Sequence, residues 1–423
     1  MAIRDFIGAF TSGKGNQVLF ATLFARLANF VVNLIIIRLL TRDDMGNLSY
    51  ALTIISFIMP FLGGGILPGL IRYGATRDGQ LEKKYYVRFA LKRGMLVSLA
   101  ILVITCLLAV FLTKKIPGAL PYLLIFVFQL FGLLIFRSVG AYCMLVHRNG
   151  WYARMEFTLS FLFLAGNISA AWIFGGMGYV VSLVTIPLLL GIYYWFRFNL
   201  GDQSKNINFT FNTKELFEYG FYTSLGSVLA QLLYSVDILL IGNILTNPEP
   251  AVAEYRVASI IPLNLIILSL AVMTTFTVKV TRNAEKNPQF VMDFYKNYLR
   301  IFIPISLAIL VFFYFGADWL VLIYGAKYQE QGDLMRIFSV GVAGGLLMRA
   351  PLGNMLPTLG FPKVNAFLSL IILGINVAGS YWALQHYGIQ GAAMVTSGMF
   401  WLSGVFSLGV FFWWWKGQTI GGQ

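Results

Sequence analysis

Polar side chains recur at helical spacing inside an otherwise apolar stretch near the N-terminus. Thr22, Arg26, Asn29 and Asn33 are separated by four, three and four residues. An α-helix places residues three and four apart on one face, so these side chains would form a single polar stripe. A guanidinium donates paired hydrogen bonds to carboxylate or phosphate oxygens. The spacing therefore predicts a helix face that binds an anion.

Three more charged residues lie within apolar stretches. Arg137 and Arg349 add two guanidinium groups, and Asp237 is the carboxylate placed deepest in any such stretch. A second polar stripe with similar spacing consists of Ser224, Ser227, Gln231 and Ser235. Three arginines against one aspartate predict a net-positive cavity, which suits an anionic substrate and disfavours an organic cation.

Each charged residue also has a structural interpretation. Arg26 could pair with Asp237 and hold two helices together. Asp237 could be a structural partner, a site for a coupling ion, or both. Arg137 and Arg349 could extend along their helices to a polar surface. The residue types alone leave these alternatives open.

The composition predicts that most of the chain lies in a bilayer. Of 423 residues, 58% are hydrophobic and 11% are charged, whereas a soluble domain is about 45–50% apolar and about 25% charged. Mean hydropathy is +0.76. About 20 apolar residues in a helix span the hydrocarbon core. Segments of suitable length lie at approximately 17–40, 47–70, 88–112, 119–142, 155–175, 178–198, 217–245, 253–277, 300–323, 334–357, 364–385 and 389–415.

These twelve segments predict an all-α integral membrane protein and place Arg26 near the middle of the first helix. An arginine at the bilayer centre costs about 2.5–3.5 kcal/mol, so its side chain is expected to face the protein interior or water. Asn167 and Asn376 also lie inside apolar segments, where we expect their amides to hydrogen-bond between packed helices.

The distribution of basic residues predicts the orientation in the membrane. The net charge is +14. Lys and Arg are concentrated in the loops predicted to lie on the same side of the membrane as the N-terminus, such as 72–93 and 279–300. Cytoplasmic loops carry such an excess, so both termini are expected in the cytoplasm. The same bias explains the basic charge without nucleic-acid binding. The loops are too short for an extramembrane catalytic domain, so no enzymatic activity is expected.

Two pairs of segments indicate an internal repeat. LLTRDDMGNLSYALTII (39–55) aligns with ILTNPEPAVAEYRVASI (244–260), at an offset of 205 residues. LSFLFLAGN (159–167) aligns with LSLIILGIN (368–376), at an offset of 209 residues. Both pairs occupy equivalent positions when the twelve segments are divided into two sets of six.

The repeat predicts two pseudo-symmetric six-helix lobes. The N-terminal lobe would comprise residues 1–199 and the C-terminal lobe residues 217–423, joined by a cytoplasmic linker at 200–216. In this alignment Gln231 corresponds to Arg26. The two polar stripes would therefore line one hydrophilic cavity, and in parallel-repeat transporters the substrate passes between the lobes.

Several motifs resemble, in this order, those of one known superfamily. They are IIIRLLTRDDMGNLSYALTIISFI (35–58), LFEYGFYTSLGSVLAQLLYSVDILLIGNIL (216–245), LIYGAKYQEQGDLMRI (322–337), TLGFPKVN (358–365) and HYGIQGAAMVTS (386–397). Together they resemble the multidrug/oligosaccharidyl-lipid/polysaccharide exporter (MOP) superfamily, and most closely its Wzx-type polysaccharide flippases. The second motif contains the Asp-x-Leu-Leu-Ile-Gly signature at Asp237–Gly242.

This resemblance implies a MATE/flippase-like fold and a transport function in polysaccharide biosynthesis, such as that of O-antigen. The substrate would be an oligosaccharide repeat unit linked to undecaprenyl pyrophosphate, which the protein would move across the cytoplasmic (inner) membrane by alternating access. The resemblance implies no cofactor other than a coupling ion, H⁺ or Na⁺, or else coupling to the membrane potential. It leaves open a complex with a polysaccharide polymerase.

The resemblance also suggests a role for each candidate residue. The anionic head group would be held by Arg26, Arg137 and Arg349. Sugar hydroxyls would be contacted by Asn29, Asn33 and Gln231. Arg72, at the inner end of the second segment, would attract the head group from the cytoplasmic side. Asp237 would balance the charge of Arg26 or bind the coupling cation.

Two other functions are weighed against the flippase. A cation-coupled multidrug antiporter of the same superfamily would depend on Asp237 and little on Arg26. A membrane glycosyltransferase or polymerase would need a catalytic carboxylate or histidine near its substrate. The two histidines, His147 and His386, fall at opposite predicted membrane faces, and the outer loops are short. The flippase is the function that the positive cavity favours.

Overall fold

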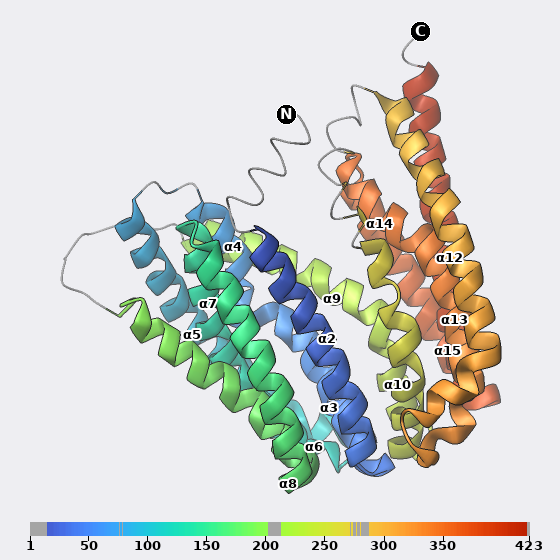
Figure 1. Cartoon of the computed structure of the whole chain (residues 1–423), viewed down its shortest axis with the longest axis horizontal. Coiled ribbons are helices and arrows are strands. Elements are labelled where there is room, and N and C mark those ends of the chain that lie inside the picture. The colour runs from blue at the N-terminus through green and yellow to red at the C-terminus, as the bar shows by residue number, and fades with distance from the viewer. Residues whose placement is uncertain are drawn as a thin grey trace. The chain divides into compact units, whose positions relative to one another are not determined.

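The computed structural model in Figure 1 describes residues 15–75, 77, 79–201, 213–270, 272, 273, 276, 280 and 287–420, and these form helices and connecting turns without a strand. Eight helical stretches among them are long and apolar enough to cross a membrane. Two of the eight, Asn149–Arg197 and Lys363–Gln418, each contain two spans joined at a glycine. Helices Gly15–Leu39 and Thr213–Ile244 bring the helical segments that match predicted ones to twelve, and residues 271, 274, 275 and 277 of the predicted segment 253–277 lie outside the described residues.

The helices follow one another with short connections. Those before position 229 are α2 (Gly15–Leu39), α3 (Arg42–Ile58), η1 (Met59–Gly64), α4 (Ile66–Gly74), α5 (Gln80–Leu112), α6 (Ala119–Phe126), α7 (Gln129–Leu145), α8 (Asn149–Arg197) and the first part of α9 (Thr213–Ile244). The later ones are α10 (Pro248–Asn264), α12 (Pro288–Leu322), η2 (Ala326–Gln331), α13 (Gly332–Gly344), the π-helix η3 (Gly345–Arg349), α14 (Ala350–Thr358) and α15 (Pro362–Ile420).

The turn between the first two helices is fixed by its sequence. Thr41 caps α3, because its hydroxyl oxygen accepts a hydrogen bond from the backbone N–H of Asp44 at 3.1 Å. Asp43 and Asp44 lie in the first turn of α3, where carboxylates interact favourably with the positive end of the helix dipole. The motif that suggested a family resemblance is thus a capped helix start.

The internal repeat is visible in two matching turns. The long helices α8 and α15 both bend at a glycine with positive φ: Gly175 has φ 62° and ψ −150°, and Gly388 has φ 57° and ψ −148°. Three residues later, a Cβ added to Gly178 or to Gly391 would lie 2.1 or 2.5 Å from the carbonyl oxygen of an alanine in the preceding helix. Only glycine fits such a close approach, so both six-helix sets make the same turn with the same residue type.

Contacts divide the chain after Val228, within α9, into an N-terminal and a C-terminal unit. The N-terminal unit packs α2 and α7 against α8, α3 against α6, and α5 against α7. The C-terminal unit packs α13 against α10, α12 and α15. The sequence-based boundaries at 1–199, 200–216 and 217–423 stay predictions, and residues 202–212 of the predicted linker lie outside the described residues.

The lipid-exposed character of the chain is clearest on α5 and α12. Leu107 and Phe111 of α5 are 77% and 76% exposed, and Phe315 and Trp319 of α12 are 74% and 80% exposed. Large side chains with such exposure would destabilise a soluble protein through contact with water, whereas lipid tails solvate them. The chain is a multi-pass membrane protein.

Two tyrosines hold the π-helix of the C-terminal unit. The hydroxyl of Tyr298 donates to the carbonyl of Leu346 at 2.6 Å, and that of Tyr295 donates to the carbonyl of Leu347 at 3.1 Å. Both tyrosines are buried on α12. A π-turn disturbs the regular i to i−4 hydrogen bonding of a helix, so its carbonyls need other donors. The tyrosine hydroxyls provide them and fix the turn that ends at Arg349.

Candidate functional site

The polar stripe of α2 is exposed within its unit. α2 packs against α8, and Ala28 and Val32 are buried, whereas Arg26 and Asn29 are exposed. Asn33 is half-buried, and its amide donates to the backbone oxygen of Asn29 at 2.8 Å. None of the ion pairs in the described part of the N-terminal unit includes Arg26. The Arg26 guanidinium is thus open to water or a ligand on this unit.

Arg137 is neutralised by a carboxylate that the sequence did not suggest. Its guanidinium on α7 forms an ion pair with Glu156 of α8, and the two side chains are 42% and 14% exposed. The two residues lie at equal distances on either side of the turn that joins these helices. Antiparallel helices bring such residues together, and this symmetry is the signal that could have revealed the pair. Arg137 therefore adds little net positive charge.

Arg349 is the last residue of the π-helix η3 and is half-buried. Its Nη2 donates to the hydroxyl of Ser369 on α15 at 3.2 Å. Gly353 follows one turn later, and a Cβ there would lie 2.7 Å from Nη1 of Arg349. Gly341, eight residues before Arg349, has the backbone of Ser397 2.7 Å from an added Cβ. π-Turns are frequent at functional sites, and nothing in the sequence indicated this one.

Arg72, at the end of α4, lies beside the first turns of α9. Its guanidinium carbon is 4.4 Å from the ring centre of Tyr219 and 5.7 Å from that of Tyr73. The two tyrosine rings meet edge to face at 6.1 Å. Such cation–π contacts are worth about 0.5–1 kcal/mol when exposed. They hold Arg72 in the last turn of α4, and the sequence predicted that this residue attracts an anionic head group.

The residues of the second polar stripe, on α9, make two kinds of contact: one bonds to a neighbouring helix, and two bond to each other. Ser224 is buried, and its hydroxyl donates to the backbone oxygen of Pro60 at 2.5 Å, so it fastens α9 to η1. Gln231 is half-buried, and its Nε2 donates to the hydroxyl of Ser235 at 3.2 Å. The side chain of Thr22, on the matching stripe of α2, lies outside the described residues. The predicted shared cavity stays a prediction.

Asp237 lies in a fully enclosed polar cluster of the C-terminal unit. It is 0% exposed, and its Oδ2 accepts hydrogen bonds from the hydroxyl of Tyr255, at 2.6 Å, and from that of Thr396. Asn376 adjoins the cluster, because its Oδ1 accepts from Ser380 at 3.2 Å and from Thr396 at 3.5 Å. Helices α9, α10 and α15 contribute these side chains.

This cluster has atoms without partners. Oδ1 of Asp237 and Nδ2 of Asn376 form no hydrogen bond in the described part of the chain. A buried carboxylate oxygen with no donor is unfavourable unless a proton or a cation binds there. Carboxylate, hydroxyl and amide oxygens are hard ligands that suit H⁺ or an alkali-metal ion such as Na⁺. The described residues contain no group of three or more His, Cys, Asp or Glu that could hold a metal ion.

The two buried asparagines predicted to hold helices together differ in their surroundings. Oδ1 of Asn167 accepts from the hydroxyl of Ser182 at 2.6 Å, which joins the two halves of α8 and confirms the expected packing bond. Oδ1 of Asn376 likewise accepts from Thr396, across the bend of α15, and this bond also brings Asn376 into the Asp237 cluster. No sequence pattern indicated that second role.

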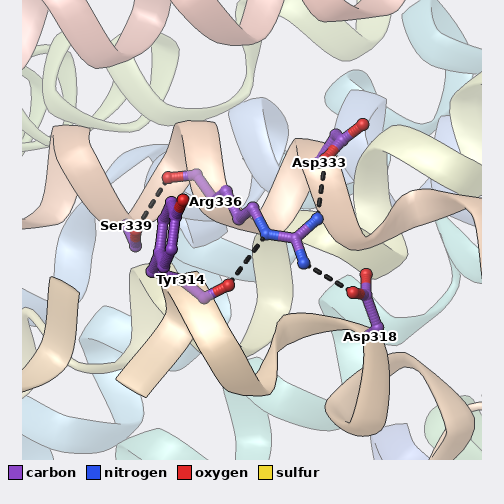
Figure 2. A network of polar contacts seen from close by, with 5 residues as sticks. All are labelled: Tyr314, Asp318, Asp333, Arg336 and Ser339. Carbon is purple, nitrogen blue, oxygen red and sulfur yellow. Dashed lines mark hydrogen bonds and ion pairs between the residues drawn. The ribbon is translucent and has the colours of Figure 1, made fainter. Parts of the chain in front are cut away.

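Arg336 shows how a fully engaged arginine differs from Arg26 and Arg72. Figure 2 shows its guanidinium between two carboxylates, with Nη2 2.5 Å from Asp318, Nη1 2.7 Å from Asp333 and Nε 3.1 Å from the backbone oxygen of Tyr314. Each of the three nitrogens donates to a residue of α12 or α13. This network links the two helices, and its two carboxylates would repel a substrate anion.

The fold is similar to that of several solved transporters. Lipid II flippase MurJ, in an inward closed conformation, has a TM-score of 0.73 at 14% identity, covering 95% of this chain and 90% of that chain. An outward-facing multidrug resistance MATE family transporter has a TM-score of 0.65 at 15% identity, covering 96% and 95%. A MOP superfamily transporter from Pyrococcus furiosus has a TM-score of 0.64 at 12% identity, covering 96% and 96%.

These likenesses establish the fold, which is the twelve-helix, two-lobe fold of the MOP superfamily. The family described as polysaccharide biosynthesis protein matches residues 35–332, which is most of the chain. The chain belongs to this family. No curated protein sequence matches it.

Proposed function

We propose that the protein is a flippase that moves oligosaccharide repeat units linked to undecaprenyl pyrophosphate across the cytoplasmic membrane. Membership of a polysaccharide biosynthesis family supports a sugar-bearing substrate, and a fold shared with a lipid II flippase supports a lipid-linked one. One observation on the chain itself carries the proposal: the exposed guanidinium of Arg26 on a membrane helix, with no ion pair to the described residues of its own unit.

The electrostatic reasoning starts from the cost of that cation. An arginine midway along a membrane helix is unfavourable by about 2.5–3.5 kcal/mol unless water or an anion compensates it. A pyrophosphate group would do so with charge-assisted hydrogen bonds of about 1.5–3 kcal/mol each. Arg349, with one hydrogen bond to a neutral serine, retains donors for the same group. Asn29, Asn33 and Gln231 would bond sugar hydroxyls.

Coupling to an ion is the second part of the proposal. The enclosed Asp237 cluster, with its unpartnered carboxylate oxygen, would bind H⁺ or Na⁺. Its burial in the C-terminal unit and its bonds to Tyr255 and Thr396 support the coupling-ion role over that of a counter-charge for Arg26. Alternating access, cytoplasmic termini, location in the inner membrane and association with a polymerase belong to the same proposal, as does the absence of enzymatic activity.

A cation-coupled multidrug antiporter is the second candidate. The Asp237 cluster favours it as much as it favours a coupled flippase, and a multidrug transporter shares the fold. The two functions differ in the charge of the substrate. An antiporter would bind a lipophilic organic cation, which the exposed arginines would repel.

Ligand-induced stabilisation of the purified protein in detergent tests the choice. Undecaprenyl pyrophosphate and a lipophilic organic cation would each be added to wild type and to the double variant Arg26→Ala with Arg349→Ala. A ligand at about 100 times its Kd stabilises the folded state by about 2.7 kcal/mol. The matched control is Arg38→Ala with Arg300→Ala, which removes two exposed arginines from α2 and α12.

We expect the pyrophosphate lipid to stabilise wild type and control but not the double variant. Stabilisation by the organic cation alone, equal in all three proteins, would contradict the flippase and support the antiporter. Stabilisation by the pyrophosphate lipid that persists in the double variant would keep the flippase and reject these two arginines as its anion site.

A further inference from the structure

A pocket of about 560 Å³ lies beside Arg72, wholly within the N-terminal unit. It is lined by Tyr73, Glu215, Glu218, Tyr219, Tyr222 and Thr223. Tyr73 lies in the last turn of α4, and the other five residues lie in the first three turns of α9. The volume is within the range of about 300–1,000 Å³ that small-molecule sites occupy. None of the roles assigned above uses this pocket.

Close helix packing fixes the walls of the pocket. α4 and α9 run antiparallel, because Gly65 contacts Gly220 and, one turn along α4, Gly69 contacts Leu216. An added Cβ at Gly69 would lie 2.7 Å from the backbone oxygen of Leu216. Tyr219 lies between these two contact positions on α9, and its ring meets that of Tyr73 edge to face at 6.1 Å. The aromatic wall is therefore positioned by backbone contacts and not by mobile side chains alone.

The chemistry of the lining suits a sugar. Tyrosine rings present flat apolar faces, against which the C–H face of a pyranose ring packs, and their hydroxyls both donate and accept hydrogen bonds. A carboxylate accepts two hydrogen bonds from neighbouring hydroxyls. Two carboxylates and two rings share one face of α9, with Glu215, Glu218, Tyr219 and Tyr222 at steps of three, one and three. The two carboxylates disfavour a lipid tail as the ligand, because an apolar chain forms no hydrogen bonds with them.

The charge of the pocket narrows the kind of sugar. Among the described residues its lining carries two carboxylates and no basic residue, so it repels acidic sugars and favours neutral or amino sugars. Arg72 adjoins the pocket through Tyr219, and its guanidinium forms no hydrogen bond to the described residues of the N-terminal unit. A pyrophosphate beside Arg72 would place the first sugar, to which it is joined directly, against the tyrosines.

We infer that this pocket is a saccharide subsite at the predicted cytoplasmic end of the protein, selective for neutral or amino sugars next to the pyrophosphate. This inference rests on the proposed flippase function, and it assigns one part of the substrate to one set of side chains. Tyr219 is the central contact, because it faces the pocket and also contacts Arg72 and Tyr73.

Saturation-transfer difference NMR on the full chain in detergent tests the inference with free sugars. The probes are N-acetylglucosamine, galactose, glucosamine and glucuronic acid, without lipid. We expect transfer to the first three and none to glucuronic acid. Tyr219→Ala should weaken binding by about threefold to tenfold, as loss of one aromatic contact does. Tyr219→Phe keeps the ring and should bind nearly as wild type. Glu218→Gln should let glucuronic acid bind.

Glu249→Gln, which neutralises a carboxylate in the first turn of α10, is the matched control and should leave the binding of all four sugars unchanged. Absence of transfer to every neutral and amino sugar, or equal transfer in Tyr219→Ala, would overturn the inference. Stabilisation by undecaprenyl pyrophosphate, measured on the same preparation, separates the two levels. Lipid binding without sugar binding would reject the subsite and keep the flippase. Sugar binding without lipid binding would keep the subsite and reject the flippase.

Discussion

The crossing of α4 and α9 offers a sharp test of the fold that positions the saccharide pocket. A Cβ added to Gly220 would lie 2.1 Å from the carbonyl oxygen of Gly65, and one added to Gly65 would lie 2.4 Å from that of Gly220. Ordinary Cβ contacts are 3.4–4 Å. Gly220→Ala must therefore separate the two helices by roughly 1 Å, since a tightly packed interior has no space to absorb the methyl group.

The free-energy change follows from three contributions. Overpacking of this kind costs about 1–3 kcal/mol. Separation of the helices also weakens the 2.5 Å hydrogen bond from Ser224 to Pro60, worth about 0.5–1.5 kcal/mol. Alanine regains up to about 1 kcal/mol of helix propensity over glycine. The sum predicts that Gly220→Ala lowers the free energy of unfolding by about 0.5–3.5 kcal/mol.

The same helix supplies the control. Gly226 has nothing within 4 Å of an added Cβ, so Gly226→Ala gains helix propensity without a clash and should stabilise the protein slightly. Chemical unfolding of both variants in detergent, followed by circular dichroism, measures the difference. Gly220→Ala should also weaken the saturation transfer from N-acetylglucosamine. Equal stability of the two variants would refute the close helix crossing on which the pocket depends.

Three further sets of substitutions probe the polar clusters. Asp237→Ala removes the acceptor of the buried Tyr255 hydroxyl and leaves Thr396 only its 3.5 Å bond to Asn376, so it should lower the free energy of unfolding by about 1–4 kcal/mol. Asp237→Asn should lower the free energy of unfolding by less than Asp237→Ala does. It should also abolish the dependence of stability on Na⁺ or on pH that wild type shows, and an unchanged dependence would exclude Asp237 as the ion site. Arg137→Gln and Glu156→Gln should each lower the free energy of unfolding by about 1–3 kcal/mol, and the double variant should lose much less than the sum of the two. Additive losses would show that the two residues do not interact. Tyr298→Phe should cost about 1–3 kcal/mol through the unpaired carbonyl of η3, against little change for Tyr314→Phe, which is 66% exposed.

Hydrophobic segment length predicted the twelve helices well, because bilayer thickness sets the length of each apolar run. The repeat was also predictable, although its alignment was incomplete. Asn167 precedes the turn at Gly175 by eight residues, whereas Asn376 precedes Gly388 by twelve. Four extra residues add about one helical turn and leave the same face toward the neighbouring helix. The insertion therefore preserves the architecture while it changes the offset between the halves.

The interactions of individual side chains were less predictable. The pairing of Arg137 with Glu156 depends on the antiparallel register of two helices, and the π-turn at Arg349 depends on donors from α12. Neither is encoded in a local pattern. The saccharide pocket was missed for a related reason: its tyrosines and carboxylates are ordinary interfacial residues until glycine contacts bring α4 and α9 together.

The charge count that favoured an anionic substrate changes in the structure, because one of its arginines has a carboxylate partner and another exposed arginine is added. Three deep arginines against one aspartate were the basis of the prediction, yet Glu156 cancels Arg137. Arg26 and Arg349 remain without a carboxylate partner inside their own units among the described residues, and Arg72 joins them as an exposed cation at the predicted cytoplasmic end. A pyrophosphate needs cations at more than one depth if it is to travel through a membrane without its water. We propose that Arg72, in the last turn of α4, and Arg26, near the middle of α2, would meet the pyrophosphate at two such depths within the N-terminal unit.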